Sequence, residues 1–479
     1  MSKQQDELNP YMFRAYDIRG TVGEDITEAT AERLGKAYGT YLPFRTVRPA
    51  LQGQSNRRSR TGLPKPSVAV GRDNRTSSPC LQQSFIMGAK STGCEIFDLG
   101  LALSPMLYFA VCYWGLDGGV NVTGSHNPVT YNGFKLTLAD AVPIAEEQIQ
   151  EIRRIANAKA FPSGQGSVTA RSITEDYVRE LASRVKIARR MKVVVDTRNG
   201  TASLFSPRII REAGCEVIGL HTESDGTFPN GVPDPEVEAN VEDLRKAVIA
   251  EKADLGIAFD GDGDRMGVVD EKGERHEADE VLMILARDFL TRHPGERVMM
   301  DVKSSRLLVQ DIENHGGRPV MFKTGHSLIK NEMREKGILL AGEVSGHIFF
   351  KENYYGFDDA TLGALRLLEA VSKRDIPVSA HWADLPRVYK TSELKAECPD
   401  DQKFQIVSEV AAYFKSRYPR SLDIDGIRVE LPEGWGLVRP SNTNPYLTLR
   451  FEAESQEAFE KIRQEIYSRL SQYKAVRLP

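Results

Sequence analysis

The sequence predicts an α/β fold of four domains, three of them similar α/β units and the last a smaller α+β domain. Two observations carry this prediction. A short β-rich run that ends in an acidic residue and leads into a turn and a helical pattern occurs three times, at 67–73, 192–196 and 297–301. The C-terminal part instead contains short runs that alternate apolar and polar residues, as half-buried antiparallel strands do.

The three units recur at similar intervals, and small polar residues follow each run, at 76–79, 197–200 and 302–305. Short strands that lead into helices are typical of repeated α/β domains. Between the first two units, the apolar stretch Met106–Leu116 is shorter than the roughly 18 residues of a membrane-spanning helix. It predicts a buried helix, and we expect no membrane partner.

The C-terminal part begins near residue 387. Ile427–Leu431 and Leu447–Ala453 have the alternation of half-buried strands, and a final helix carries one apolar stripe of Phe459, Ile462, Ile466 and Leu470. We therefore expect domains at 1–172, 173–274, 275–386 and 387–479.

The formal net charge of −4 over 479 residues argues against binding of nucleic acid through bulk charge.

The five cysteines are scattered and no secretory signal is visible, which favours a cytoplasmic protein with free thiols. The segment Arg45–Pro66 has six basic residues and no acidic ones, and we expect a solvated loop remote from the site.

The strongest chemical signal is the run Asp260-Gly-Asp-Gly-Asp-Arg265. Three carboxylates on alternate residues of an extended loop form a hard oxygen cluster suited to Mg²⁺ or another divalent ion. A solvated acidic turn is one alternative. An EF-hand is another, because Glu271 would be its twelfth residue, but Arg265 occupies the sixth position, where that loop needs glycine. The run also lies between two strand-like segments rather than two helices.

The second signal is Thr123-Gly-Ser-His-Asn-Pro128, which follows the predicted strand 119–122. A serine on such a turn is presented to a ligand. A Ser/His hydrolase is one option, but Ser125 and His126 are adjacent and we expect their side chains to diverge; a G-x-S-x-G elbow is also absent. A serine beside a metal-binding loop favours phosphoryl transfer instead.

Two further polar loops and several cations complete the set. Gly342–His347 has short polar side chains between glycines, which suit sugar hydroxyls, and Arg439–Pro445 has the residue types of an anion-binding loop between the two tail strands. The cations include Arg19, Lys135 and Lys303, and each of them taken singly is typical of a surface charge.

In this order, the motifs resemble those of the α-D-phosphohexomutase superfamily, in particular its bacterial phosphomannomutase/phosphoglucomutase branch. The resemblance extends from Tyr11 to the C-terminal domain. It implies four domains around a central cleft, Mg²⁺ as cofactor, and a hexose 1,6-bisphosphate of glucose or mannose as intermediate and activator. With such a cleft, we expect five cations to converge on it: Arg19, Lys135, Arg265, Lys303 and Arg439. The chain would act as a monomer or homodimer that interconverts hexose 1-phosphate and hexose 6-phosphate.

The resemblance also implies the roles of individual residues. Ser125 matches the phosphoserine, with Arg19, Lys135 and His347 as further catalytic residues. The serine phosphate and three aspartates would hold the metal: Asp260, Asp262 and Asp264. The remaining matches would bind substrate: Tyr16, Arg265, Lys303, His326, Glu343, Ser345, His347, Arg439, Ser441, Asn442 and Thr443.

Sugar specificity rests on smaller features. Val344 stands where the phosphoglucosamine mutase branch tends to have Gln, and Ser441-Asn-Thr-Asn-Pro445 differs from that branch's pattern, so the sequence favours glucose and mannose. The alternatives are a phosphoglucosamine mutase, a Ser/His hydrolase and a non-catalytic sugar-phosphate-binding protein.

Overall fold

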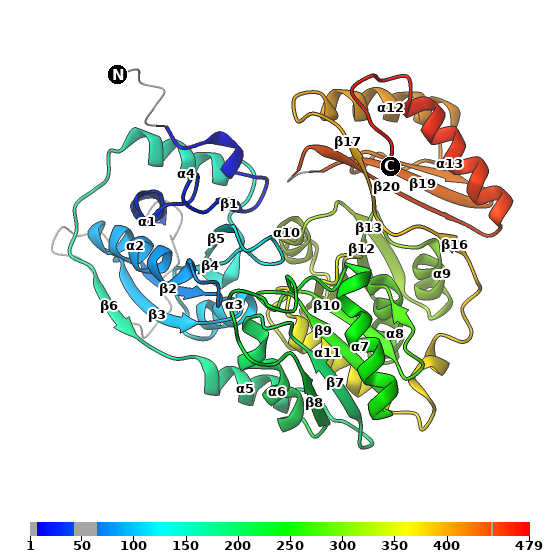
Figure 1. The fold of residues 1–479 in the computed structure, drawn as a ribbon, viewed down its shortest axis with the longest axis horizontal. Coiled ribbons are helices and arrows are strands. Elements are labelled where there is room, and N and C mark those ends of the chain that lie inside the picture. The colour runs from blue at the N-terminus through cyan, green and yellow to red at the C-terminus, as the bar shows by residue number, and fades with distance from the viewer. Residues whose placement is uncertain (1–6, 43–64, 442–443) are drawn as a thin grey trace.

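A computed structural model of the chain describes residues 7–42, 65–441 and 444–479. Four sheets follow one another along the chain (Figure 1). Most of the basic segment Arg45–Pro66 lies outside the described residues; at its end, Lys65 Nζ donates to the carbonyl of Gln165 at 3.0 Å.

The first sheet has the strand order β1-β5-β4-β2-β3-β6. Its strands are β1 (Ile18–Thr21), β2 (Ser67–Arg72), β3 (Glu95–Leu101), β4 (Gly118–Val122), β5 (Tyr131–Leu138) and β6 (Ser167–Ala170). The helices of this part are α1 (Glu28–Tyr41), α2 (Ser78–Ser91), α3 (Ser104–Tyr113) and α4 (Glu147–Ala158). Every residue of α3 from Ser104 to Val111 is buried, as the apolar stretch predicts.

The second sheet has the order β11-β10-β9-β7-β8 and the third β13-β12-β14-β15. The second unit contains α5 (Thr174–Ser183), β7 (Lys192–Asp196), α6 (Ser206–Glu212), β8 (Glu216–Leu220), α7 (Glu238–Glu251), β9 (Leu255–Phe259), β10 (Met266–Asp270) and β11 (Arg275–His276). The third contains α8 (Ala278–Arg292), β12 (Arg297–Asp301), α9 (Arg306–Asn314), β13 (Arg318–Phe322), α10 (His326–Lys336), β14 (Leu340–Gly342), β15 (Ile348–Phe350) and α11 (Ala360–Ser372).

The three units share one topology. The predicted strand of each unit, β2, β7 or β12, lies between two parallel neighbours. After the second of these neighbours the chain turns back, and the strand that follows, β5, β10 or β15, pairs with it antiparallel. The prediction of three similar mixed-sheet domains is thereby confirmed. Because the carboxyl ends of parallel strands lie at the same edge of a sheet, the loops that follow these strands can lie close together.

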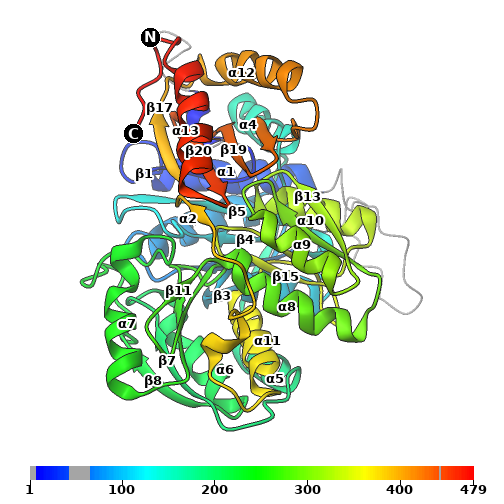
Figure 2. The same ribbon diagram turned by 90° about the vertical axis from the view of Figure 1, so that its right-hand side faces the viewer.

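The C-terminal part is an antiparallel sheet of five strands with two helices on one face (Figures 1 and 2). Its elements are β16 (Tyr389–Lys390), β17 (Leu394–Glu397), α12 (Lys403–Arg417), β18 (Ile427–Leu431), β19 (Gly434–Pro440), β20 (Tyr446–Ala453) and α13 (Gln456–Leu470). The predicted stripe on α13 is buried against this sheet. The domain boundaries given above remain predictions.

The apolar cores show how these parts are joined. One continuous core links α3 of the first unit with the second and third units, whereas the C-terminal domain has a core of its own. In the described residues, no helix combines the length and the apolar character that crossing a membrane requires.

Candidate active site

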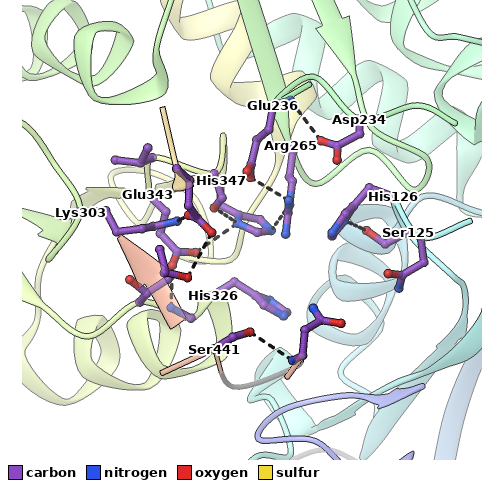
Figure 3. Close-up of a pocket in the computed structure, with 18 of the residues that line it drawn as sticks. Ser125, His126, Asp234, Glu236, Arg265, Lys303, His326, Glu343, His347 and Ser441 are labelled. Carbon is purple, nitrogen blue, oxygen red and sulfur yellow. Dashed lines mark hydrogen bonds and ion pairs between the residues drawn. The ribbon is translucent and has the colours of Figure 1, made fainter. Parts of the chain in front are cut away.

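All four domains contribute to one cavity of about 550 Å³ (Figure 3). Thirteen of the predicted site residues line it: Tyr16, Arg19, Ser125, Lys135, Asp264, Arg265, Lys303, His326, Glu343, Ser345, His347, Arg439 and Ser441. Asp260 and Asp262 are fully buried rather than part of the wall. Asn442 and Thr443 lie outside the described residues.

Ser125 lies in the loop between β4 and β5 and is 2 % exposed. Its φ of +49° is in the left-handed region, which costs energy for a residue with a Cβ. Its hydroxyl donates to Asp260 Oδ2 at 2.9 Å and also lies 3.1 Å from His126 Nδ1. The expectation that Ser125 and His126 diverge is therefore wrong, because the left-handed backbone turns the serine side chain back toward its neighbour.

The loop Asp260–Arg265 connects β9 to β10, and its first carboxylate organises it from inside. Asp260 Oδ1 accepts the backbone N–H groups of Gly263, Asp264 and Arg265 at 2.9, 3.1 and 3.2 Å. A Cβ at Gly261 would lie 2.3 Å from the carbonyl oxygen of Ser125, so glycine permits the close approach of the two loops.

The three aspartates fit a divalent cation. A carboxylate oxygen of each lies within 4.8 Å of the others, and all three side chains are buried. Burial and the negative charges of Asp264 and Asp262 raise the pKa of Asp260 well above its usual value, a repulsion that a cation relieves. Among the described residues, Oδ1 of Asp262 accepts no hydrogen bond. Hard oxygen donors of this kind suit Mg²⁺.

The EF-hand alternative is excluded by the same geometry. The loop joins two strands, and the Glu271 carboxylate accepts the N–H and the hydroxyl of Ser379 at 2.9 and 2.6 Å, at the far end of β10.

Lys135, on β5, faces the carboxylate cluster. Its Nζ lies 2.8 Å from Asp262 Oδ2 and forms an ion pair with Asp264. Burial opposes its charge, but the two carboxylates outweigh burial and raise the pKa of Lys135 well above its usual value. This lysine therefore stays charged within the carboxylate cluster.

The loop between β14 and β15 supplies Glu343, Ser345 and His347. His347 Nδ1 lies 2.8 Å from Ser345 Oγ and 3.1 Å from Glu343 Oε2, and its Nε2 lies 3.5 Å from Asp264 Oδ1. Although burial disfavours the imidazolium, Asp264 and Glu343 raise the pKa of His347 to about 9. Glu343 Oε1 also accepts the N–H of Gly325 at 2.6 Å.

The other expected cations line the cavity, one from each of the four domains, and each one has a carboxylate partner. The pairs are Arg19 with Asp17 at 2.7 Å, Arg265 with Glu236 at 2.9 Å, Lys303 with Glu393 at 2.9 Å and Arg439 with Asp425 at 2.9 Å. His326, at the start of α10, has Nδ1 2.9 Å from Asp358 Oδ2 and packs edge-on against Tyr16.

The predicted anion-binding loop needs one correction. Arg439 and Pro440 belong to strand β19, which lies between the two predicted tail strands, because they pair with Thr448 and Leu447; the predicted loop therefore begins after Pro440. Ser441 Oγ accepts the N–H of Asn444 at 3.1 Å.

Sequence reasoning missed several cavity residues, notably Asp234, Glu236, Glu393 and Lys395. None belongs to a recognisable motif. The clustered prolines and asparagine around Asp234 were the one available signal of an exposed turn there.

Comparison with known proteins places this geometry in a family. Four domain descriptions of phosphoglucomutase/phosphomannomutase match in order: alpha/beta/alpha domains I, II and III at 11–163, 175–273 and 277–389, and the C-terminal domain at 393–469. A phosphomannomutase/phosphoglucomutase of Pseudomonas aeruginosa is 44 % identical over 452 residues, covering 94 % of each chain. A phosphoglucomutase of Neisseria meningitidis is 41 % identical, covering 97 % of this chain and 96 % of its own.

A crystal structure gives the same result. A phosphoglucomutase/phosphomannomutase family protein from Burkholderia thailandensis superposes with a TM-score of 0.86 and 36 % identity, covering 97 % of this chain and 98 % of its own. The chain belongs to the phosphoglucomutase/phosphomannomutase family.

Proposed function

We propose that this enzyme interconverts hexose 1-phosphate and hexose 6-phosphate, of mannose, glucose or both, through a phosphorylated Ser125. One observation carries the proposal. The Ser125 hydroxyl touches a buried carboxylate triad and opens into a cavity whose walls bring cations from all four domains. Lysine and arginine side chains bind phosphate groups. A serine beside a divalent-cation site can carry a phosphoryl group whose charge the cation neutralises during transfer.

In the first half-reaction, the bond between phosphorus and Ser125 Oγ breaks as a sugar oxygen forms a bond to phosphorus, and the proton of that sugar hydroxyl ends on Ser125 Oγ. Mg²⁺ held by Asp260, Asp262, Asp264 and the serine phosphate would neutralise charge on the transferring group. Lys135, His347 and Arg19 line the same cavity and would stabilise the equatorial oxygens. The product is a hexose 1,6-bisphosphate, which serves as intermediate and, when added, as activator.

The bisphosphate then turns within the cavity and returns its other phosphate to Ser125. The phosphate that is not transferred must be held in both orientations. Arg439 at the end of β19 and Ser441, with Asn442 and Thr443 next to it in the sequence, are proposed for this role. Four further residues line the cavity and are proposed to contact the sugar: Arg265, Lys303, His326 and Tyr16.

Sugar selection is assigned to the loop of Glu343 and Ser345, which would hold O3 and O4. Glucose and mannose differ at C2, so a site that holds O3 and O4 discriminates weakly between them. Dual specificity is therefore the proposal. Val344 and the Ser441–Pro445 pattern argue against glucosamine as the preferred sugar.

A Ser/His hydrolase is the second candidate, because Ser125 Oγ and His126 Nδ1 lie 3.1 Å apart. Burial and the nearby Arg265 and Arg19 lower the pKa of His126 well below its usual value, so the ring is neutral. Within the described chain, however, no carboxylate is hydrogen-bonded to His126 to orient it, as a catalytic triad needs. A non-catalytic sugar-phosphate-binding protein would leave Ser125 without phosphate.

Residues of one chain line the cavity, so the proposed reaction needs no second subunit. Both a monomer and a homodimer are compatible with the proposal. All five cysteines are free thiols, which supports a reducing, cytoplasmic location.

The decisive experiment combines intact-mass measurement with a coupled assay of glucose 1-phosphate conversion, in Mg²⁺ and a trace of glucose 1,6-bisphosphate. We expect one phosphate on Ser125, loss of nearly all turnover in Ser125→Ala, and loss of activity when a chelator removes divalent cations. Ester hydrolysis that survives the chelator would favour the hydrolase. Saturable sugar-phosphate binding without phosphate on Ser125 would favour the binding protein.

A further inference from the structure

A buried arginine outside the cavity wall holds the loop that carries Ser125. Arg75 lies between β2 and α2 and is 1 % exposed. Its Nη2 donates to the carbonyl oxygens of Ser125 and Asn127 at 2.7 and 2.6 Å. Its Nη1 donates to those of Pro128 and Tyr131 at 2.7 and 3.1 Å. One guanidinium thus satisfies four carbonyls of a single loop.

Asp73 fixes this guanidinium from the opposite side. Its Oδ2 lies 3.2 Å from Arg75 Nε and also accepts the N–H of Gly124 at 3.0 Å, while Oδ1 accepts the N–H of Arg75 and is hydrogen-bonded to Ser78 Oγ. A planar guanidinium can bond in several fixed directions at once, which an ammonium cannot do.

The backbone of the loop needs such a support. Ser125 has φ +49°, a conformation that persists only where its surroundings enforce it. At the preceding residue, Gly124, a Cβ would lie 2.4 Å from Arg75 Nε and 2.5 Å from its Cζ. The guanidinium therefore packs directly against the loop and leaves no space for a side chain at position 124.

The residue before Arg75 connects the same segment to the second domain. Asn74 Nδ2 donates to Asn199 O and Ser224 Oγ at 2.6 and 2.9 Å, and its N–H donates to Thr201 Oγ1 at 3.1 Å. Thr201 in turn donates its N–H to the carbonyl of Gly261, in the carboxylate loop, at 3.1 Å. The segment thus links the serine loop to the loop that holds the metal-binding carboxylates.

We propose that Arg75 is a positioning residue for phosphoryl transfer. Its four hydrogen bonds hold Ser125 in the left-handed conformation that directs Oγ at Asp260, and Asn74 keeps this loop in register with the carboxylate loop. Arg75 acts through the backbone and lines no part of the cavity wall. The proposal rests on the proposed role of Ser125.

The substitution Arg75→Lys keeps the charge beside Asp73 but cannot serve four carbonyls. We expect kcat to fall on the order of 100-fold, because small misplacement of a reacting group has effects of that size, while KM for glucose 1-phosphate changes less than about threefold. Arg287→Lys is the matched control. Arg287 is a partly buried arginine, with its side chain 19 % exposed, bonded to Asp311 and to the carbonyl of His381, and it lies on α8 away from the cavity.

Two additional measurements separate positioning from folding. Hydrogen exchange of the amides at 125–131 should accelerate in Arg75→Lys and not in Arg287→Lys, a readout that does not depend on activity. Gly124→Ala should displace the guanidinium without removing it and reproduce the kcat defect. In Arg75→Ala, added guanidinium should restore part of kcat, whereas ethylammonium at equal concentration should not.

The proposal is overturned if folded Arg75→Lys keeps kcat within twofold of the wild type, or if its loss of kcat and of melting temperature matches that of Arg287→Lys. It is also overturned if Arg75→Lys fails to fold and Gly124→Ala is fully active. A wild-type chain without mutase activity would instead contradict the proposed function, and the exchange experiment would still test whether Arg75 holds the loop.

Discussion

At the scale of single residues, the cations that line the cavity already have carboxylate partners. Arg265 pairs with Glu236, Lys303 with Glu393 and Arg439 with Asp425, all in a largely buried setting. An incoming phosphate must therefore displace a carboxylate or join it. Breaking such a pair leaves a buried charge, which is costly unless the phosphate replaces the lost interaction.

The pair of Lys303 and Glu393 gives a test of this competition. Although burial opposes its ionisation, Lys303 lowers the pKa of Glu393 to about 2, so the carboxylate is charged at neutral pH. Glu393→Gln removes the competitor, and we expect KM for the sugar phosphate to fall roughly three- to tenfold, as the loss of about 1 kcal/mol of competing interaction implies. Steady-state kinetics measure this, with Glu397→Gln as the control at an exposed position. An unchanged or higher KM would contradict the competition.

Asp359 predicts a pH dependence of stability. It is 1 % exposed, accepts the hydroxyls of Tyr177 and Tyr354 at 2.9 and 3.1 Å, and caps α11 through the N–H of Leu362. Burial raises its pKa from 3.8 to about 6. Between these pH values the folded state holds a proton that the unfolded state has lost, so the contribution of Asp359 to stability is full below pH 4 and falls as the pH rises through 6.

We therefore expect Asp359→Asn, which keeps the cap and can donate to both tyrosine oxygens, to raise the free energy of unfolding at pH 7.5 by at most about 3 kcal/mol. At pH 4 the variant and the wild type should differ little. Thermal unfolding at both pH values measures this. A stability difference that does not depend on pH would show that the charge of Asp359 is not its cause.

At the scale of elements, the sequence predicted where strands begin and end better than it predicted which of their faces are buried. The runs at 192–196 and 297–301 are strands with those limits, because a buried parallel strand is an apolar run that stops where a polar loop begins. The alternation at 447–453 predicted one exposed face, but Thr448, Arg450 and Glu452 are buried. Two of them contact the third unit: Arg450 pairs with Glu277 at 2.6 Å, and Glu452 Oε1 accepts the N–H of Arg306 at 2.9 Å.

Local pattern cannot reveal such burial, because the partner lies far away in the chain. The same reason explains the cavity residues. Ser125 and the three aspartates stand in motifs, whereas Glu236 and Glu393 reach the cavity only because the domains assemble around it. Asn442 and Thr443 stay predictions, as does the solvated character of most of the segment Arg45–Pro66.

The stripe on α13 yields a prediction for this element. Ile466 is 1 % exposed, and a Cβ on Gly436 of β19 would lie 2.4 Å from its Cδ1, so helix and sheet are in close contact. Ile466→Ala should cost about 2–5 kcal/mol. Because the C-terminal core is separate, calorimetry should show an early transition of this domain alone. Ile249→Ala, at a 55 % exposed position, should change little; a uniform shift of all transitions would contradict independent unfolding.

At the scale of the whole molecule, the joints between domains differ in kind. The first three units share one apolar core through α3, which resists relative motion because close-packed interiors do not deform freely. The C-terminal domain meets the third unit through one small apolar cluster, in which Val302 packs with Trp435 and Leu437, and through a set of polar contacts. Arg428 donates to the carbonyls of Val302 and Ser304 at 2.8 and 2.5 Å, and Arg306 donates to those of Leu431 and Gly434 at 2.7 Å.

Polar contacts of this kind can be exchanged one for another, so the C-terminal domain is the part that can rotate, about the irregular segment near residue 387. Substrate phosphate held by Arg439 would draw this domain toward the cavity, and we expect the radius of gyration from solution scattering to decrease at saturating glucose 1-phosphate. Ser125→Ala, which binds without transfer, should show the same decrease, whereas Arg439→Ala should not at equal substrate concentration. Identical scattering profiles with and without substrate, at a concentration where calorimetry shows full binding, would mean that the cavity works without closure, and that the polar joint serves only to assemble the four domains.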